Sequence, residues 1–255
     1  MFSPAHPLWL VGFRPFFALA CLAGLSLPVA WILIFRGVLP APAQHFSPVQ
    51  WHAHEMFFGF GWAVLGGFLL TASKNWVGVR GYHGGTLMFL AAAWIFERIG
   101  MSFGAGWPAP LFLLSNNLFL MSIVVLLLAT LIRHRGKDSY RRDNIFFLII
   151  LPLFWIAKTL LLQPDHFHLG WSMTLGLFRV AFLVMLERTL SQFMRSAFSV
   201  EILRRPALDT TIKVLAALLV FAALFPAPLP AGLELLLAVL LLGRLAFWHP
   251  LKGFS

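Results

Sequence analysis

A short polar segment places several groups that could bind a metal directly before an apolar run. His52 and His54 form a His-x-His pair in HAHEMFFGF, and Met56 follows two residues later. Neutral imidazole binds copper, iron or zinc, and thioether sulfur is a soft ligand that suits copper. His52, His54 and Met56 are therefore candidate metal ligands. The alternative is that these polar groups only anchor a helix at the membrane surface.

A second His-x-His pair, HFH, supplies His166 and His168 more than 100 residues later. A metal site inside a membrane protein needs ligands from separate segments, so this pair adds two candidate metal ligands. For HFH alone, anchoring at the membrane surface is the favoured interpretation. The single cysteine, Cys21, can form neither an internal disulfide nor a thiolate cluster, so a metal would depend on His, Met or carboxylate ligands.

The composition indicates that these residues are carried by membrane helices. The chain is 60% hydrophobic and 11% charged, whereas soluble domains have about 25% charged residues. A helix needs roughly 20 mainly apolar residues to cross a bilayer. The sequence predicts an all-α, polytopic integral membrane bundle forming a single transmembrane domain. Its eight expected spans are 16–35, 53–73, 85–100, 111–132, 144–162, 169–187, 210–225 and 229–248.

The basic residues orient the expected spans. The link 133–143 carries five Lys/Arg, and the link 188–209 adds four. The links expected on the opposite side of the membrane, 36–52, 101–110, 163–168 and 226–230, contain only Arg36. Cytoplasmic links are enriched in Lys and Arg, so both termini are predicted to be cytoplasmic. The apolar and basic segment 188–209 is expected to lie flat on the inner membrane surface. This topology explains the net charge of +10 without a nucleic-acid partner. The expected partner of the protein is the lipid bilayer.

The same topology gathers His52, His54, His166 and His168 on the outer side. Successive residues of an α-helix turn by about 100°, so His52 and His54 should point about 200° apart and serve different partners. Met56 falls on the side of His52, above a stripe of small residues that another helix or a flat macrocycle could approach. This side is expected to be the packed one. The stripe consists of Gly59, Ala63 and Gly67.

Ionisable residues inside the expected spans need partners. Arg179 lies near the middle of its span, where an arginine costs at least about 2.5 kcal/mol, so a haem propionate, an anionic substrate or a carboxylate should face it. Snorkelling of Arg179 along a tilted helix is the alternative. Lys158 and Arg244 are expected to snorkel to the membrane surface. Glu97 and its neighbour Arg98 are expected to form a local pair at that surface.

Polar residues also gather at the expected inner side of the first two spans. Arg14 begins the first span within GFRPFF, while Asn75 and Trp76 end the second. These three residues either anchor the helices separately or form a polar pocket together.

Four pieces of the first 78 residues, HPLW, GFRPFF, WHAHEMFFGF and GGFLLTASKNWVG, resemble the NnrS family in order and spacing. The resemblance implies a bacterial inner-membrane protein that contains haem and copper. It implies that His52 and His54 are ligands and that Arg14, Asn75 and Trp76 support the site. The implied role is protection from nitrosative stress, through redox chemistry at a metal or handling of nitric oxide or iron-nitrosyl species.

The chain departs from the family pattern in two respects. TASKNW replaces the usual TAVPNW and brings a charge, Lys74, to the inner exit. Family members have about twelve spans with further histidines in the last ones, so this chain is either the N-terminal part of a longer protein or a shorter variant that uses His166 and His168.

Three functions compete at this point. The leading hypothesis is a haem and copper membrane protein of the nitric oxide response, with Arg179 or Arg14 facing the haem propionates. The alternative is a multi-pass transporter or channel for a small polar or anionic solute, with Arg179 on its path. An assembly subunit without chemistry of its own is the third.

Overall fold

The computed structural model describes residues 3–42, 46–199, 201–203 and 205–248, which are helical with connecting turns and contain no strand. Eight helices in this part of the chain are long and apolar enough to cross a membrane. The predicted all-α fold of a multi-pass membrane protein is therefore confirmed. The chain divides into two compact units, residues 1–167 and 168–255. The orientation of the spans across the membrane stays a prediction.

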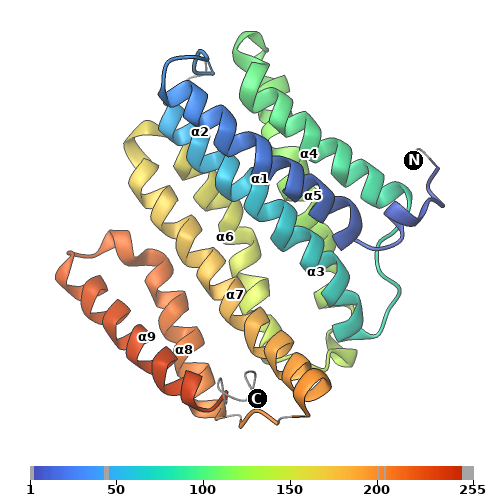
Figure 1. Ribbon diagram of the computed structural model, residues 1–255, viewed down its shortest axis with the longest axis vertical. Coiled ribbons are helices and arrows are strands. Elements are labelled where there is room, and N and C mark those ends of the chain that lie inside the picture. Colours follow the sequence, from blue (N-terminus) through green and yellow to red (C-terminus); the bar gives the residue numbers. More distant parts are fainter. Residues whose placement is uncertain (1–2, 43–45, 200, 204, 249–255) are drawn as a thin grey trace. The chain divides into compact units, whose positions relative to one another are not determined.

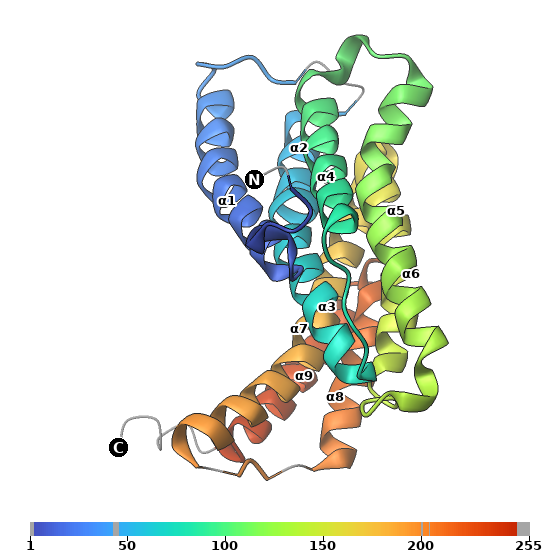
Figure 2. The same cartoon turned by 90° about the vertical axis from the view of Figure 1, so that its right-hand side faces the viewer.

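The first unit is a bundle of five spans, the second of which is made of α2, a π-helical segment and α3 (Figures 1 and 2). The helix α1 packs against α3, α4 packs against α5, and α5 packs against both α3 and α6. The helices are α1 (Phe13–Phe35), α2 (Pro48–His54), α3 (Trp62–Val77), α4 (Gly85–Phe103), α5 (Ala109–Arg133) and α6 (Asn144–Leu162).

The second span is a continuous helical rod in which the helix type changes. It starts at a capping box, where the hydroxyl of Ser47 accepts from the N–H of Gln50 and the Gln50 side chain accepts from the N–H of Ser47. After α2 the π-helical segment η2 (Glu55–Gly61) follows, and α3 then ends at Gly78 in the left-handed conformation. A π-helix has i→i+5 hydrogen bonds and occurs mostly as short insertions. The constant turn of 100° per residue assumed from the sequence therefore fails beyond His54.

The small residues of this rod let α1 approach closely. A Cβ atom on Gly67 would lie 2.7 Å from the Cβ of Phe16, and the backbone N–H of Phe13 donates to Thr71 Oγ1 at 2.9 Å. Ala63 is completely buried. Of the two interpretations of the stripe, helix packing is the one that these contacts support.

The second unit contains α7 (Phe167–Phe198), α8 (Pro206–Leu218), the 3-10 segment η6 (Leu219–Leu224) and α9 (Pro228–Ala246). Close contact between α7 and η6 depends on Gly176, where a Cβ would lie 2.8 Å from Val220 Cα. The helix α7 continues for 32 residues, so residues 188–198 extend the helix of the sixth span, and the expectation that 188–209 lies flat on the inner membrane surface stays a prediction. The apolar side of α7 continues beyond Glu187, because Met194 is still buried.

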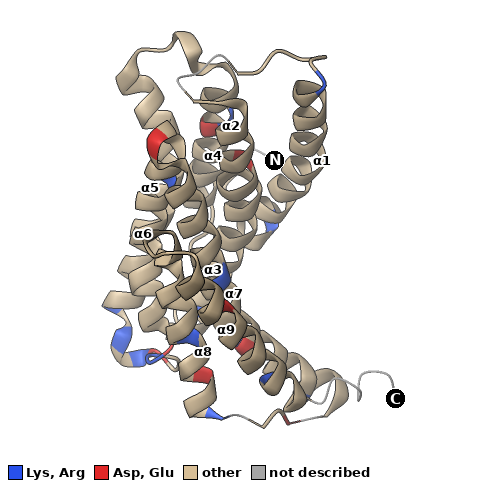
Figure 3. Ribbon diagram, turned by 90° about the vertical axis from the view of Figure 1, so that its left-hand side faces the viewer, with Lys and Arg blue, Asp and Glu red and all other residues tan. Residues whose placement is uncertain are grey.

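Charged residues lie within the length of the spans as well as at their ends (Figure 3). Lys158 and Arg244 are only 1% and 3% exposed, so the expectation that both snorkel is wrong. A buried cation in a membrane bundle must have partners inside the protein. Lys158 finds them in the first unit and Arg244 in the second, as described below.

Candidate functional site

Five ionisable residues and one amide meet inside the first unit and form what we call the buried charge cluster. They come from the second span and from α4, α5 and α6, which are separated by loops along the chain. All are buried except Arg98, whose side chain is 12% exposed. The cluster consists of His54, Glu55, Glu97, Arg98, Asn116 and Lys158.

Glu97 is the centre of the cluster. Its Oε1 accepts a hydrogen bond from Lys158 Nζ, and it lies 3.2 Å from Arg98 Nη2 and 3.3 Å from His54 Nε2. Lys158 Nζ also donates to the backbone carbonyl of Asn116. The expected pair of Glu97 and Arg98 is present, but it is not a local pair at the surface, because Glu97 is fully buried and also contacts His54 and Lys158 from two other helices.

Glu55 is the second carboxylate of the cluster. Its Oε1 lies 3.2 Å from His54 Nδ1, and its Oε2 lies 3.2 Å from Arg98 Nε. Two carboxylates thus face two cations, so the cluster is electrically balanced with a neutral imidazole. Such balance is the condition under which buried charges are tolerated.

The glycine in HEMFFGF makes room for these side chains. A Cβ on Gly59 would lie 2.5 Å from Arg98 Nη1 and 3.0 Å from Glu55 Oε2. Its carbonyl accepts from the indole N–H of Trp94 at 2.9 Å. The π-helical segment η2 therefore serves the cluster, in agreement with the tendency of such segments to occur at functional sites.

His54 is held on both ring nitrogens. Its Nδ1 lies 3.2 Å from Glu55 Oε1, and its Nε2 lies 3.4 Å from the amide nitrogen of Asn116 and 3.3 Å from Glu97 Oε1. The same amide nitrogen donates to Met101 Sδ at 3.2 Å. His54 is 0% exposed, and its contacts fix both its position and its orientation.

His52 has a different environment. Its ring stacks on Trp31 of α1, with ring centroids 4.3 Å apart and an interplanar angle of 13°. Trp31 packs in turn against the buried Phe46, Trp51 and Met101. The Nδ1 atom of His52 is buried and has no hydrogen-bond partner. This ring therefore holds a polar atom that nothing in the described structure satisfies.

The two histidines serve different neighbours, as their predicted separation implies. The side that carries His52 was expected to be the packed one. Its small-residue stripe does pack against α1, but the fully buried histidine is His54, whereas His52 is half-buried. The reason is the polar cluster, because α4 and α5 supply partners for His54, whereas His52 contacts α1.

The other residues predicted for a site lie outside the cluster. Arg14 is exposed and donates to the carbonyl of Pro7 at 2.8 Å, and Asn75 is also exposed. Trp76 is buried and stacks on Phe147 of α6. The predicted pocket between Arg14, Asn75 and Trp76 therefore gains no support from these contacts.

The remaining candidate ligands are separate as well. Met56 is half-buried, and His166 and His168 are exposed. Within the described ranges, no group of three or more His, Cys, Asp or Glu side chains is arranged to hold a metal ion. Arg179 lies 3.5 Å from Glu234 of α9, so a carboxylate, one of its three predicted partners, faces it.

A family model described as NnrS protein matches residues 7–255. The chain belongs to the NnrS family. The match extends far beyond the 78 residues that carry the motifs, so the later spans are also those of the family. Membership links the protein to the nitric oxide response in general, and the family is known to bind haem and copper. No curated protein and no solved structure matches the chain.

Among the six members of this NnrS protein's cluster, only His54 was predicted as a site residue. Glu97 and Arg98 were expected to pair at the membrane surface, Lys158 was expected to snorkel, and Asn116 was not singled out. One signal could have found Lys158: it stands inside the apolar span 144–162, where an ionisable residue is a functional candidate by default. Glu97 in another span was its available partner. Asn116 carries no comparable signal, because a single uncharged amide in an apolar helix does not indicate one particular role.

The contacts of the two histidines decide which of them fits a cofactor. The lone pair of an imidazole nitrogen lies in the plane of the ring, so the stacking on Trp31 leaves the nitrogens of His52 available. His52 would therefore fit as a haem ligand. His54 does not fit as it stands, because Glu55, Glu97 and Asn116 surround its two nitrogens. The residues around Met56 likewise form no ready copper site, and we assign copper no ligands here.

Proposed function

We propose that this NnrS protein is a haem-containing membrane protein, with copper as its second cofactor, that binds nitric oxide or iron-nitrosyl species or acts on them by redox chemistry. His52 is the proposed haem ligand. The observation that carries this assignment is its buried, unpartnered Nδ1. A buried polar atom without a hydrogen bond costs free energy, and a role as a metal ligand would offset this cost for Nδ1 of His52. When bound, haem iron supplies the site for nitric oxide and the change of redox state.

The indole of Trp31 has a positioning role in this proposal. By stacking on His52 it restricts rotation of the imidazole, and its own packing against Trp51 and Met101 makes this wall rigid. A fixed ring holds its in-plane nitrogens in one direction, which would suit a ligand of haem iron.

The buried charge cluster is proposed to fix the second span next to this ligand. His54 is two residues from His52, and its two ring nitrogens connect α2 to Glu55 on one side and to Glu97 and Asn116 on the other. The cluster thereby holds the helix that carries His52. His54 remains a proposed metal ligand only for a state in which a metal replaces its contacts with the cluster.

An optical spectrum with metal analysis of detergent-purified protein tests the proposed function. Expression with sufficient haem and copper should give a Soret band and bound copper, and addition of a nitric oxide donor to the reduced protein should shift the band. Nitric oxide must reach the haem iron for such a shift. Absence of both the band and copper would contradict the proposal.

A further inference from the structure

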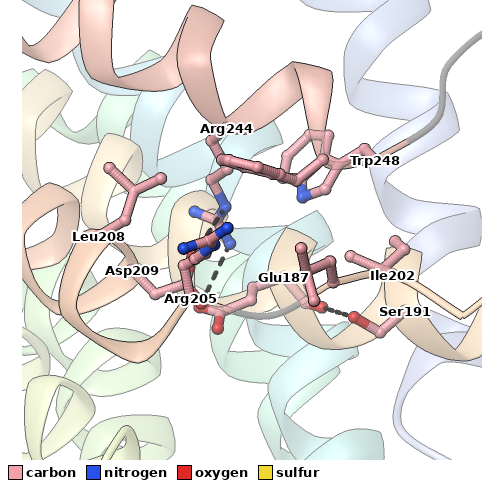
Figure 4. A pocket seen from close by; sticks show the side chains of 10 residues that line it. Glu187, Ser191, Ile202, Arg205, Leu208, Asp209, Arg244 and Trp248 are labelled. Atoms are coloured by element: carbon pink, nitrogen blue, oxygen red, sulfur yellow. Dashed lines mark hydrogen bonds and ion pairs between the residues drawn. The ribbon is translucent and has the colours of Figure 1, made fainter.

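The second unit contains a charged pocket that the proposed function does not use (Figure 4). It lies where the end of α7, the start of α8 and the end of α9 meet. Glu187 and Asp209 line it together with Arg205 and Arg244. Phe247 and Trp248 supply apolar surface from the residues that follow α9.

The carboxylates of this pocket are already neutralised. Glu187 Oε2 lies 2.7 Å from Lys213 Nζ and 3.4 Å from Arg244 Nη2. Asp209 Oδ1 lies 3.1 Å from Arg244 Nε. All four side chains are at least nine-tenths buried. The Nε and Nη2 atoms of Arg244 are therefore directed at acidic groups of the protein.

One nitrogen of Arg244 is left over. Its Nη1 atom is buried without a hydrogen-bond partner, although the residue is only 3% exposed. A buried guanidinium nitrogen without an acceptor is costly, and the cost is larger for a charged group than for a neutral one. An acceptor that enters the pocket would remove this cost.

Arg205 adds a second positive group. It is exposed, and its guanidinium lies 5.1 Å from the ring centroid of Phe247. The structure gives it no carboxylate partner among the residues described. Arg205 and Arg244 line the pocket, and Lys213 pairs with Glu187 beside it, so three cations stand against the two carboxylates. One positive charge is in excess, and the exposed Arg205 places it where a ligand can enter.

We propose that this pocket binds the phosphate group of an anionic phospholipid. Arginine is suited to phosphate because its planar fork presents paired donors. The apolar side chains of Leu208, Phe247 and Trp248 favour a lipid over a soluble anion, since aromatic residues at the ends of spans lie at the level of the headgroups. The predicted topology puts the pocket at the cytoplasmic leaflet, where anionic lipids concentrate and basic pockets between spans bind their headgroups.

Native mass spectrometry of the full chain, with added phosphatidylglycerol or phosphatidylcholine, tests this proposal. The wild type should retain phosphatidylglycerol in preference, and Arg205→Gln should bind it about fivefold more weakly, the factor for roughly 1 kcal/mol per basic residue near the membrane. Arg195→Gln is the matched control, because Arg195 is an exposed residue near the end of α7 that does not line the pocket and lies 3.7 Å from the exposed Glu201. This variant should bind phosphatidylglycerol like the wild type.

The outcomes separate the site from a general basic surface. Equal losses in the two variants, or no preference for phosphatidylglycerol in the wild type, would overturn the proposal. Displacement of the lipid by millimolar inorganic phosphate would overturn the lipid assignment and give the pocket to a soluble phosphate. The haem content of Arg205→Gln should equal that of the wild type, so that failure of this proposal is distinct from failure of the proposed function.

Discussion

Replacing Glu97 by glutamine is expected to lower the free energy of unfolding by about 3–5 kcal/mol, the usual cost of breaking a buried ion pair by removing one partner. Glu97 is fully buried and contacts Lys158, Arg98 and His54, so its loss leaves two cations facing one carboxylate, Glu55. The change can be measured as a lower thermal midpoint of the purified protein in detergent.

A double variant serves as the internal control for this prediction. Glu97→Gln combined with Lys158→Met removes one charge of each sign and leaves Glu55 paired with Arg98. Stability should therefore recover in large part, with a favourable interaction term in the double-mutant cycle. If the single variant is as stable as the wild type, or if the losses of the two single variants simply add, the buried charge cluster is not the electrostatic unit described above.

Replacing His52 by alanine is expected to abolish most of the Soret absorption while changing the free energy of unfolding by no more than about 1 kcal/mol. The ring is half-buried, its Nδ1 makes no hydrogen bond, and its loss takes away one stacking contact with Trp31. Aromatic pairs of this kind contribute roughly 0.5–1.5 kcal/mol. Absorption per protein at the Soret maximum is the readout.

Free imidazole distinguishes loss of a ligand from loss of packing. Added to the His52→Ala variant during haem reconstitution, it should restore the Soret band in part, because it can occupy the space left on the face of Trp31. His83→Ala is the matched control, since His83 is exposed and its ring contacts only the carbonyl of Gly81, at 2.9 Å. A wild-type Soret band in His52→Ala would remove His52 from the haem site.

The sequence predicts the spans well because their cause is local. Each span is a run of apolar residues long enough to cross a bilayer, and the structure contains a helix at every one of the eight expected positions. The resemblance carried by HPLW, GFRPFF, WHAHEMFFGF and GGFLLTASKNWVG was also sufficient to find the family. Local patterns and short motifs thus determine the class of fold and the family.

The partners inside the bundle could not be predicted in the same way. Glu97 and Lys158 are 61 residues apart, and only the packing of α4 and α6 around α5 makes them neighbours. The direction of His54 relative to the later part of the second span depends on the change from α-helix to π-helix at Glu55. No residue type in the sequence predicts that change. For this reason Lys158 was expected to reach the surface, whereas its burial depends on a carboxylate from another helix.

Haem content of two matched variants, His52→Gln and His54→Gln, tests the central claim most directly. The claim is that the histidines of HAH divide two tasks: His52 binds haem, and His54 joins the second span to the buried charge cluster. Measured as pyridine haemochrome per folded protein, haem should be lost from His52→Gln and retained by His54→Gln, whose amide can still bond to Glu55 and Asn116. Loss of haem from His54→Gln with retention by His52→Gln, or equal loss from both, would contradict the claim.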